Sequence, residues 1–519
     1  MDMPDERSAA TPGTNDRPAP AAGPAGSLVE HFTRFIAVMA VAPGTIPDQL
    51  DRLEALQVAT PDGGSRPLWL PLDEATQASQ VRFLLPWVRD YLMGVVPDGS
   101  LRRDRDCIAR RWNPDAAADI RGKLTWDADG ASLFSLDGCE VYLFSTGIAV
   151  AVLECSILTR QGLAPNLNDL VDFNYVLQRL EPHRVPAIRV AGWRSRPPGQ
   201  AAPQFLPGLA SAAGMTLEGI LRQTLAPLFA TPGTEILDRR AFKVQTFARV
   251  GPGERLDDLG QTFYQLRRVV GPSYPAAPAD LALEGRADTV RTFENVVVGF
   301  SLEGFAVLLV DTGHPFYAEF ANRVRCSYFA HYLVALHQRS ALLVLALEAG
   351  RLPRITPGRF EADERLHRLL RDLRLRAIDF NLHHRFSQVS TMTHYAQVYE
   401  GLTDALAIPS LLDEVRDEIG ELDEILRLHR ERSEQEQRDS DARERDRAER
   451  AEADRDRRLN QTIAVLGPLS LLLSLYGTNL PDYSQVRTYL SPAFWLPLCA
   501  WLLLTVLLWR LARRKPGGG

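Results

Sequence analysis

Hydrophobic positions along this chain follow three patterns, and each predicts a different kind of structure. Between residues 27 and 350, apolar runs of strand length alternate with longer helical stretches, which predicts an α/β domain. From 351 to 458 we expect a stalk of long helices, in the first part of which apolar residues recur every three or four positions. Residues 459–480 and 493–511 are apolar over a membrane-spanning length. The expected fold is therefore an α/β cytoplasmic domain, a helical stalk and two C-terminal transmembrane helices.

Two stretches of the α/β region resemble one another. Residues 140–150 and 296–307 each contain an apolar strand, a Ser/Gly turn and a second apolar strand, which is typical of a β-hairpin. The two hairpins either belong to a duplicated unit or pair within one sheet. Helical patterns surround them at 210–229 and 316–348, and the Pro- and Gly-rich segment 196–208 is interpreted as a connecting loop.

The stalk contains apolar stripes followed by a long charged run. After Ile408 and Pro409, apolar residues recur in steps of three and four as far as Leu426, which is compatible with a coiled-coil seam. Beyond Leu428 the apolar residues stop, and 431–458 consists almost wholly of Asp, Glu, Arg, Gln and Ala. Glu and Arg stand at i,i+4 spacing, so this run is either a solvated helix or a disordered linker.

Composition and motifs exclude several functions. The chain has 519 residues and a formal net charge of -6, which does not predict a nucleic-acid partner. It contains no GxxxxGK[ST] loop, no GxGxxG after a strand and no nucleophile elbow, so we expect no enzyme and no bound cofactor. The five cysteines form no CxxC pair and are expected to be free thiols. His383 and His384 are adjacent, and adjacent side chains on a helix face different ways, which does not suit a metal site.

The flanks of the apolar segments predict how they cross a membrane. Basic residues precede the first segment and follow the second, whereas the loop 481–492 carries only Arg487. The positive-inside rule then places both termini in the cytoplasm, the loop outside, and 512–519 as a cytoplasmic basic tail. Residues 1–26 have no basic start and no apolar core, so they predict a disordered leader rather than a secretory signal. We expect two spans of the cell inner membrane; the alternative is a buried helical hairpin of a soluble protein.

The first apolar segment also contains polar residues and a proline. Ser470, Ser474 and Asn479 are spaced by four and five residues, so they fall loosely on one helical face. Polar side chains within a membrane usually face a bundle interior or a water-filled path, although serines also simply pack helices together. Pro468 removes one backbone hydrogen bond and tends to kink the helix.

The end of this segment resembles a known signature. Residues 476–479 read Tyr-Gly-Thr-Asn, which is similar to the Gly-Met-Asn signature of the CorA family of magnesium and divalent-cation channels. Gly477 and Asn479 match, and Thr478 stands in place of the methionine. Upstream, residues 467–470 read Gly-Pro-Leu-Ser and resemble the family's Met-Pro-Leu-Thr at the same spacing from the asparagine. The resemblance covers about the last hundred residues.

This resemblance implies a homopentameric channel in which 459–480 lines the pore. A ring of Asn479 side chains would bind a hydrated cation at the outer mouth, and Gly477 would permit the turn there. The family's pore hydroxyl corresponds to Ser470, and a pore-facing glycine corresponds to Ser474. In the outer loop, Asp482 would supply negative charge, which Arg487 nearly cancels.

The implied cargo is Mg²⁺, with Co²⁺, Ni²⁺ and Zn²⁺ as alternatives. In the family, cytoplasmic carboxylates between subunits sense magnesium, and the candidates here are Asp363, Asp372, Asp413 and Asp417. A second hypothesis remains open, in which the chain is a membrane-anchored sensor or interaction protein. In that case the α/β domain carries the function and the hairpin is an oligomerising anchor.

Overall fold

The computed structural model describes most of the chain as two compact units, Met1–Glu421 and Leu422–Gly519. The described residues are 26–41, 46–59, 65–93, 106–114, 120–127, 130–180, 189–190, 194–195, 216–352, 364–478 and 492–513. The predicted loop 196–208, Asp363 and nearly all of the predicted leader and outer loop lie outside these ranges.

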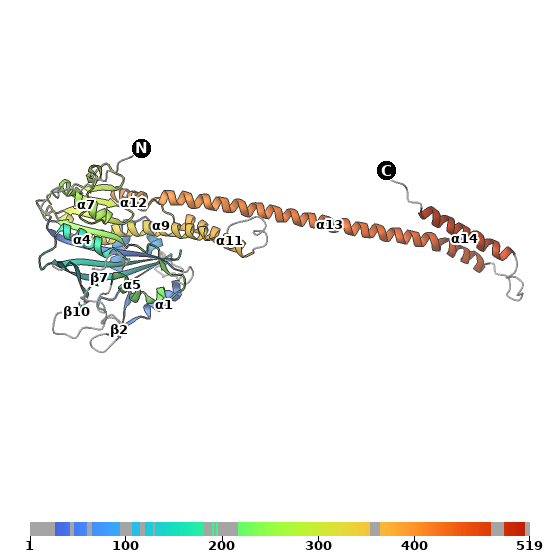
Figure 1. Ribbon diagram of the computed structural model, residues 1–519, viewed down its shortest axis with the longest axis horizontal. Helices are drawn as coiled ribbons and strands as arrows, with labels where there is room; N and C mark the ends of the chain where they lie inside the picture. Colours follow the sequence, from blue (N-terminus) through green and yellow to red (C-terminus); the bar gives the residue numbers. More distant parts are fainter. Residues whose placement is uncertain are drawn as a thin grey trace, which may run out of the picture. The chain divides into compact units, whose positions relative to one another are not determined.

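A 13-stranded sheet forms the centre of the first unit (Figure 1). Its strands are β1 (Leu28–Ala40), β4 (Trp69–Pro71), β5 (Cys107–Trp112), β6 (Ile120–Asp127), β7 (Gly130–Phe144), β8 (Ile148–Arg160), β9 (Arg189–Val190), β10 (Arg194–Ser195), β11 (Glu235–Ile236), β12 (Lys243–Val250), β13 (Thr289–Phe293), β14 (Val296–Phe300) and β15 (Gly304–Val310). The main path runs β10-β6-β7-β8-β1-β12-β15-β14-β13. Every neighbouring pair on this path is antiparallel except β12 and β15, which are parallel. A separate pair joins β2 (Gln57–Ala59) to β3 (Ser65–Pro67).

Both predicted hairpins are confirmed, and they lie in the same sheet. Strands β7 and β8 pair from Phe144 and Ile148 outward, around a turn in which Gly147 adopts a φ of 82°. A positive φ costs glycine little, which explains the residue at this turn. Strands β14 and β15 form the second hairpin, and β1 and β12 stand between the two pairs.

Helices cover both faces of the sheet because the side chains of its central strands alternate between them. On β1, Phe35 and Met39 belong to the main hydrophobic core, which includes residues of α4 (Leu167–Leu177) and α7 (Gly260–Arg268). Arg34 points to the opposite face, towards the π-helix η5 (Val324–Tyr328). That face also carries α9 (Phe329–Gly350) and α12 (Thr393–Ala405).

The remaining helices are shorter and connect these layers. They are α1 (Ile46–Glu54), α2 (Glu74–Val81), α3 (Pro86–Met93), α5 (Leu217–Thr224), α6 (Ala226–Phe229), η2 (Leu256–Leu259), η3 (Pro278–Leu281), η4 (Pro315–Tyr317), α8 (Phe320–Arg323), α11 (Glu364–Asp379) and the π-helix η6 (Phe380–His384). The helical patterns expected at 210–229 and 316–348 thus correspond to α5, α6, α8, η5 and α9. Four of the five cysteines are buried free thiols, and Cys499 is exposed.

The continuous helical segment Phe320–Gly350 is long and apolar enough to cross a membrane, by length and composition alone. It is the one helix in the described ranges that meets this test, and 56% of its most apolar window is buried inside the structure. Core helices of soluble domains pass the same test. Because Phe329 and Leu333 are buried, we interpret the segment as the core helix on this face of the sheet. The membrane spans expected at 459–480 and 493–511 stay predictions.

The long helix α13 (Ile408–Thr478) follows α12 after a tight connection. Ala407 in this connection adopts a left-handed φ of 53°, which ends one helix before the next begins. Leu412 and Val415 are buried, so the first part of the stripe expected as a coiled-coil seam packs within the first unit. The helix continues through Pro468. A last helix, α14, spans Pro492–Arg513.

Candidate functional site

The predicted pore residues lie at the end of α13 as far as the structure describes them. Ser470 and Ser474 are exposed, and the Ser470 hydroxyl donates to the carbonyl of Gly467 at 2.9 Å. Gly477 and Thr478 are the last two residues of the helix, so the chain is still helical at the glycine where a turn was expected. Asn479 and Asp482 lie outside the described residues. Whether these side chains converge on a pore stays a prediction.

Several apolar side chains that the structure describes in this second unit are exposed. On α13, Ile463 and Leu466 are 62% and 53% exposed, and on α14 Leu496 and Leu503 are 67% and 71% exposed. Water-soluble proteins rarely expose contiguous apolar surface of this kind, whereas helices facing lipid or other subunits do. This exposed apolar surface is a candidate for contact with lipid or with other subunits.

The candidate regulatory carboxylates are solvent-exposed. Asp372 lies on α11, and Asp413 and Asp417 lie on α13, where Asp413 pairs with Arg416 at 3.0 Å. Throughout the described ranges, no group of three or more His, Cys, Asp or Glu side chains is arranged to hold a metal ion. The intersubunit sensing role thus remains a prediction for these carboxylates.

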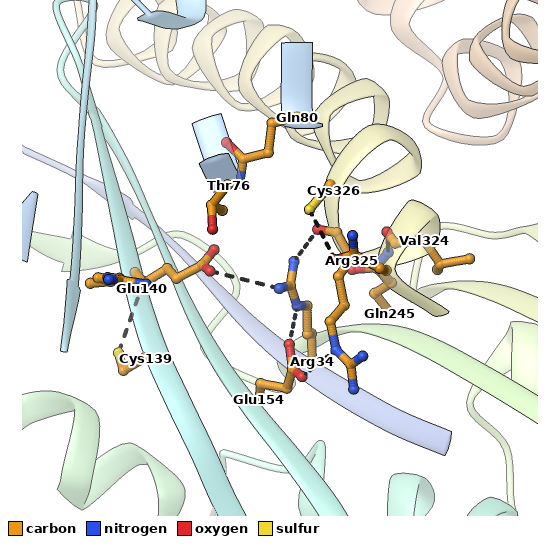
Figure 2. Close-up of polar contacts among 12 residues, drawn as sticks. Arg34, Thr76, Gln80, Cys139, Glu140, Glu154, Gln245, Val324, Arg325 and Cys326 are labelled. Atoms are coloured by element: carbon orange, nitrogen blue, oxygen red, sulfur yellow. Dashed lines mark hydrogen bonds and ion pairs between the residues drawn. The ribbon is translucent and has the colours of Figure 1, made fainter. Parts of the chain in front are cut away.

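Sequence reasoning missed a charged cavity of about 260 Å³ in the first unit. Arg34 of β1 stands at its centre, and its side chain is only 5% exposed (Figure 2). Its Nε donates to Oε2 of Glu154 on β8 at 2.7 Å, and its Nη1 donates to the carbonyl of Arg325 at 2.8 Å. Glu140 of β7 lies 3.7 Å away from Nη2 on the other side. One guanidinium thus connects two strands of the sheet to η5.

Two backbone irregularities shape this cavity. The π-helix η5 brings Arg325 to Glu154, whose Oε1 accepts from the Arg325 Nε at 2.7 Å. The carbonyl of Val324 accepts from the Gln245 side chain at 3.1 Å. On the opposite wall, the register of β7 against β8 shifts at Asp137, which marks a β-bulge. π-Helices and bulges both concentrate near functional sites, where they re-aim side chains.

The charges in the cavity hold one another ionised. Burial alone would lower the pKa of Arg34, but Glu154 and Glu140 outweigh it and raise the pKa above its ordinary value. Burial would raise the pKa of Glu154, yet Arg34 and Arg325 lower it. Burial raises the pKa of Cys326 to about 11 and that of Cys139 well above its usual range. Both thiols are therefore protonated near neutral pH and are poor nucleophiles.

These charged groups are better suited to holding the strands and η5 together than to catalysing a reaction. The arginines and carboxylates balance, the thiols are unreactive, and the donors of Arg34 are occupied by protein groups. The signal that could have revealed the cluster is a charge within a mostly apolar strand, Arg34 in β1 and Glu154 in β8. Charged residues are almost never fully buried unless they are paired.

Comparisons with known proteins add little to this picture. No protein-family model matches the chain, and no curated protein matches it. Among solved structures, it is similar to one described as the structure of the full-length CmaX protein, at 12% sequence identity. That similarity covers 52% of this chain and 89% of the other, with a TM-score of 0.15. A TM-score this low does not establish a common fold.

Proposed function

We propose that this chain forms a homo-oligomeric channel in the cell inner membrane that passes divalent cations down their electrochemical gradient. Mg²⁺ is the first candidate ion, and Co²⁺, Ni²⁺ and Zn²⁺ are the alternatives. The observation that carries the proposal is the exposed apolar surface of α14 and of the end of α13. In a bilayer, lipid and neighbouring copies would cover that surface.

The polar residues on α13 support a path for ions. Ser470 and Ser474 lie one helical turn apart on an otherwise apolar segment, which places both hydroxyls on one face. When several copies assemble with this face inward, the hydroxyls line a common axis. The Asn479 amide oxygens would then meet at its outer end and hold an ion through its water shell.

Flux measurements on the purified full-length chain in liposomes test the proposal. We expect Mg²⁺-dependent signals from an enclosed indicator, driven by the ion gradient alone and without ATP. The absence of flux for Mg²⁺, Co²⁺, Ni²⁺ and Zn²⁺, with the protein shown to be inserted, would refute it. Asn479→Ala should abolish flux or selectivity, whereas Gln485→Ala, which removes a nearby amide, should retain both. Equal behaviour of these two variants would remove Asn479 from its assigned role.

A second function follows from the large folded first unit. Its sheet and two cavities exceed what an anchor requires, which favours a membrane-anchored sensor or interaction protein. On this hypothesis the chain inserts and oligomerises but conducts no ion. The same liposomes therefore distinguish the two functions, since crosslinked oligomers without flux support the sensor and flux supports the channel.

A further inference from the structure

A second cavity in the first unit, of about 480 Å³, adjoins the charged one. Asn322 and Cys326 line both cavities, so α8 and η5 form their common wall. Six of the other lining side chains are Phe or Tyr, and they come from β13, η4, α8, η5, α12 and the residues after α2. These side chains are Phe83, Phe293, Phe316, Phe320, Tyr328 and Tyr395.

The rings form one connected wall. Phe83 stacks on Tyr395 with centroids 5.0 Å apart, and Tyr395 meets Tyr328 at 5.1 Å. On the other side Phe293 meets Phe316 edge-on at 5.0 Å. Small-molecule pockets are typically apolar and aromatic with a few placed polar groups, and they occupy about 300–1,000 Å³. This cavity fits that description in both size and lining.

Two arginines give the cavity a positive charge. The Arg323 guanidinium lies 4.3 Å from the Phe316 ring centre, and that of Arg82 lies 5.3 Å from Phe83. Glu319 is the one carboxylate in the lining. In the described part of the chain, neither arginine forms an ion pair, unlike Arg34 and Arg325 in the neighbouring cavity. The two guanidiniums are therefore available to an anion.

A buried hydroxyl supplies a further polar group. Tyr328 is 1% exposed, and its hydroxyl lies beside that of Thr292, which acts on it as a hydrogen-bond partner. The two hydroxyls have no other partner among the described residues. Because a hydroxyl has one donor and two acceptor lone pairs, this pair retains hydrogen-bonding capacity for a polar ligand atom.

The positive charge of the two arginines also shifts the pKa values of neighbouring side chains. Burial raises the pKa of Tyr395, and both Arg323 and Arg82 oppose that rise. Burial lowers the pKa of His394, and Arg323 lowers it further. Cations that act on two separate side chains in the wall favour a negatively charged occupant.

We propose that this cavity binds a mononucleotide, with its base against the aromatic wall and its phosphate at Arg82 and Arg323. The Tyr328 hydroxyl donates to an acceptor on the bound molecule. Bases stack on aromatic side chains regardless of sequence because every base has a π-face. Guanidinium groups bind phosphate through paired N–H donors. This site is independent of the proposed channel, because binding and ion flux are measured separately.

Calorimetric titration of the detergent-solubilised full-length chain tests the proposal with AMP, adenosine and inorganic phosphate as probes. We expect AMP to bind at least tenfold more tightly than adenosine or phosphate, because only AMP engages both the rings and the arginines. If inorganic phosphate binds as tightly as AMP, the base does not stack on the aromatic wall. If adenosine binds as tightly as AMP, the arginines do not bind the phosphate group. If none of AMP, GMP, CMP and UMP binds, the proposal is wrong.

Matched variants localise the binding. Arg323→Gln should weaken AMP binding by tenfold or more, whereas Arg89→Gln, on an exposed arginine outside the cavity, should leave it unchanged. Tyr328→Phe keeps the ring and removes the hydroxyl, so affinity should fall several-fold while the melting temperature is retained. Equal affinities for Arg323→Gln and Arg89→Gln would place the nucleotide elsewhere and refute the site.

Discussion

The two units of this protein differ in how far their charged and apolar side chains are exposed. In the first unit, Arg34 is buried and paired, and all seven residues of β15 are buried. In the second, Arg450 and Asp446 pair at 3.5 Å with side chains 82% and 67% exposed, and apolar α14 residues such as Leu503 are exposed too. The first unit buries most of its apolar side chains within itself, whereas those described in α14 and at the end of α13 are largely exposed. Both cavities described above lie in the first unit.

Arg34→Met should have the largest effect on stability. The methionine keeps the apolar stem but removes the charge that Glu154 and Glu140 face, and breaking a buried pair costs about 3–5 kcal/mol. We expect the lower end of that range because Arg325 remains as a partner for Glu154. The measurement is the free energy of unfolding of the first unit by denaturant titration.

The control for Arg34 is Arg416→Met, which removes an exposed arginine that pairs with Asp413 on α13. Exposed pairs of this kind contribute less than about 1 kcal/mol, so stability should barely change. Adding Glu140→Gln to Arg34→Met should recover part of the loss, because it removes the carboxylate that faces Arg34 on the other side. A loss from Arg34→Met no larger than that from Arg416→Met would show that the buried network does not support the fold.

Gly401→Ala and Gly420→Ala compare a closely packed helix with an exposed one. A Cβ at Gly401 of α12 would stand 2.8 Å from Cδ2 of the buried Phe300, whereas a Cβ at Gly420 of α13 meets nothing within 4 Å. Overpacking costs about 1–3 kcal/mol, so Gly401→Ala should destabilise the first unit by that amount. Gly420→Ala should instead stabilise its helix by up to about 1 kcal/mol. Calorimetric melting of both variants measures the two effects, and the same sign for both would contradict the close approach of α12 to β14.

Much of the fold could be predicted from local sequence. The hairpins β7/β8 and β14/β15 follow from apolar strands around Ser/Gly turns, and the first part of α13 follows from its apolar spacing. The sequence left the charged run 431–458 open between helix and linker, and the structure continues α13 through it. Sheet order could not be predicted, because β1 pairs with β8 and β12 across long stretches of chain. The π-helices η5 and η6 also escaped prediction, since no residue pattern distinguishes them from ordinary helix.

The candidate sites also differ in how far local sequence predicts them. A local signature was enough to name the pore residues Gly477, Ser470 and Ser474. Whether these residues line a common pore depends on how copies of the chain assemble. The charged cavity was missed because its parts are distant in sequence, with Arg34 lying 120 residues from Glu154 and 291 from Arg325. A charge within a mostly apolar strand is compatible with a buried pair, but local sequence cannot identify the partner.

Acid should destabilise the first unit through its buried histidines. Burial lowers the pKa of His331 to about 4, with a smaller effect from His394, whereas the unfolded value is 6.5. Because the folded pKa is depressed, the neutral ring's contribution is complete above pH 6.5 and is lost as pH falls towards 4. At pH 5 the loss from His331 alone is about 2 kcal/mol.

Denaturant titrations at pH 7.5 and pH 5 test this pH dependence. His331→Gln should lose less stability between the two pH values than the unmodified chain. The exposed His383 provides the control, and His383→Gln should leave the difference unchanged. If both variants show the same pH dependence as the unmodified chain, His331 is not responsible.

Arg450→Gln should have the smallest effect, and its size tests whether the charged run of α13 is held by local interactions. Arg450 pairs with Asp446 at i,i+4, and Arg438 pairs with Glu434 in the same way. Each exposed helical pair contributes about 0.2–0.5 kcal/mol and is weakened by salt. We therefore expect a slight loss of helicity by circular dichroism that disappears at high salt. A large loss of helicity that persists at high salt would mean that this arginine is buried by another copy of the chain, and the charged run would then belong to an interface rather than to solvent.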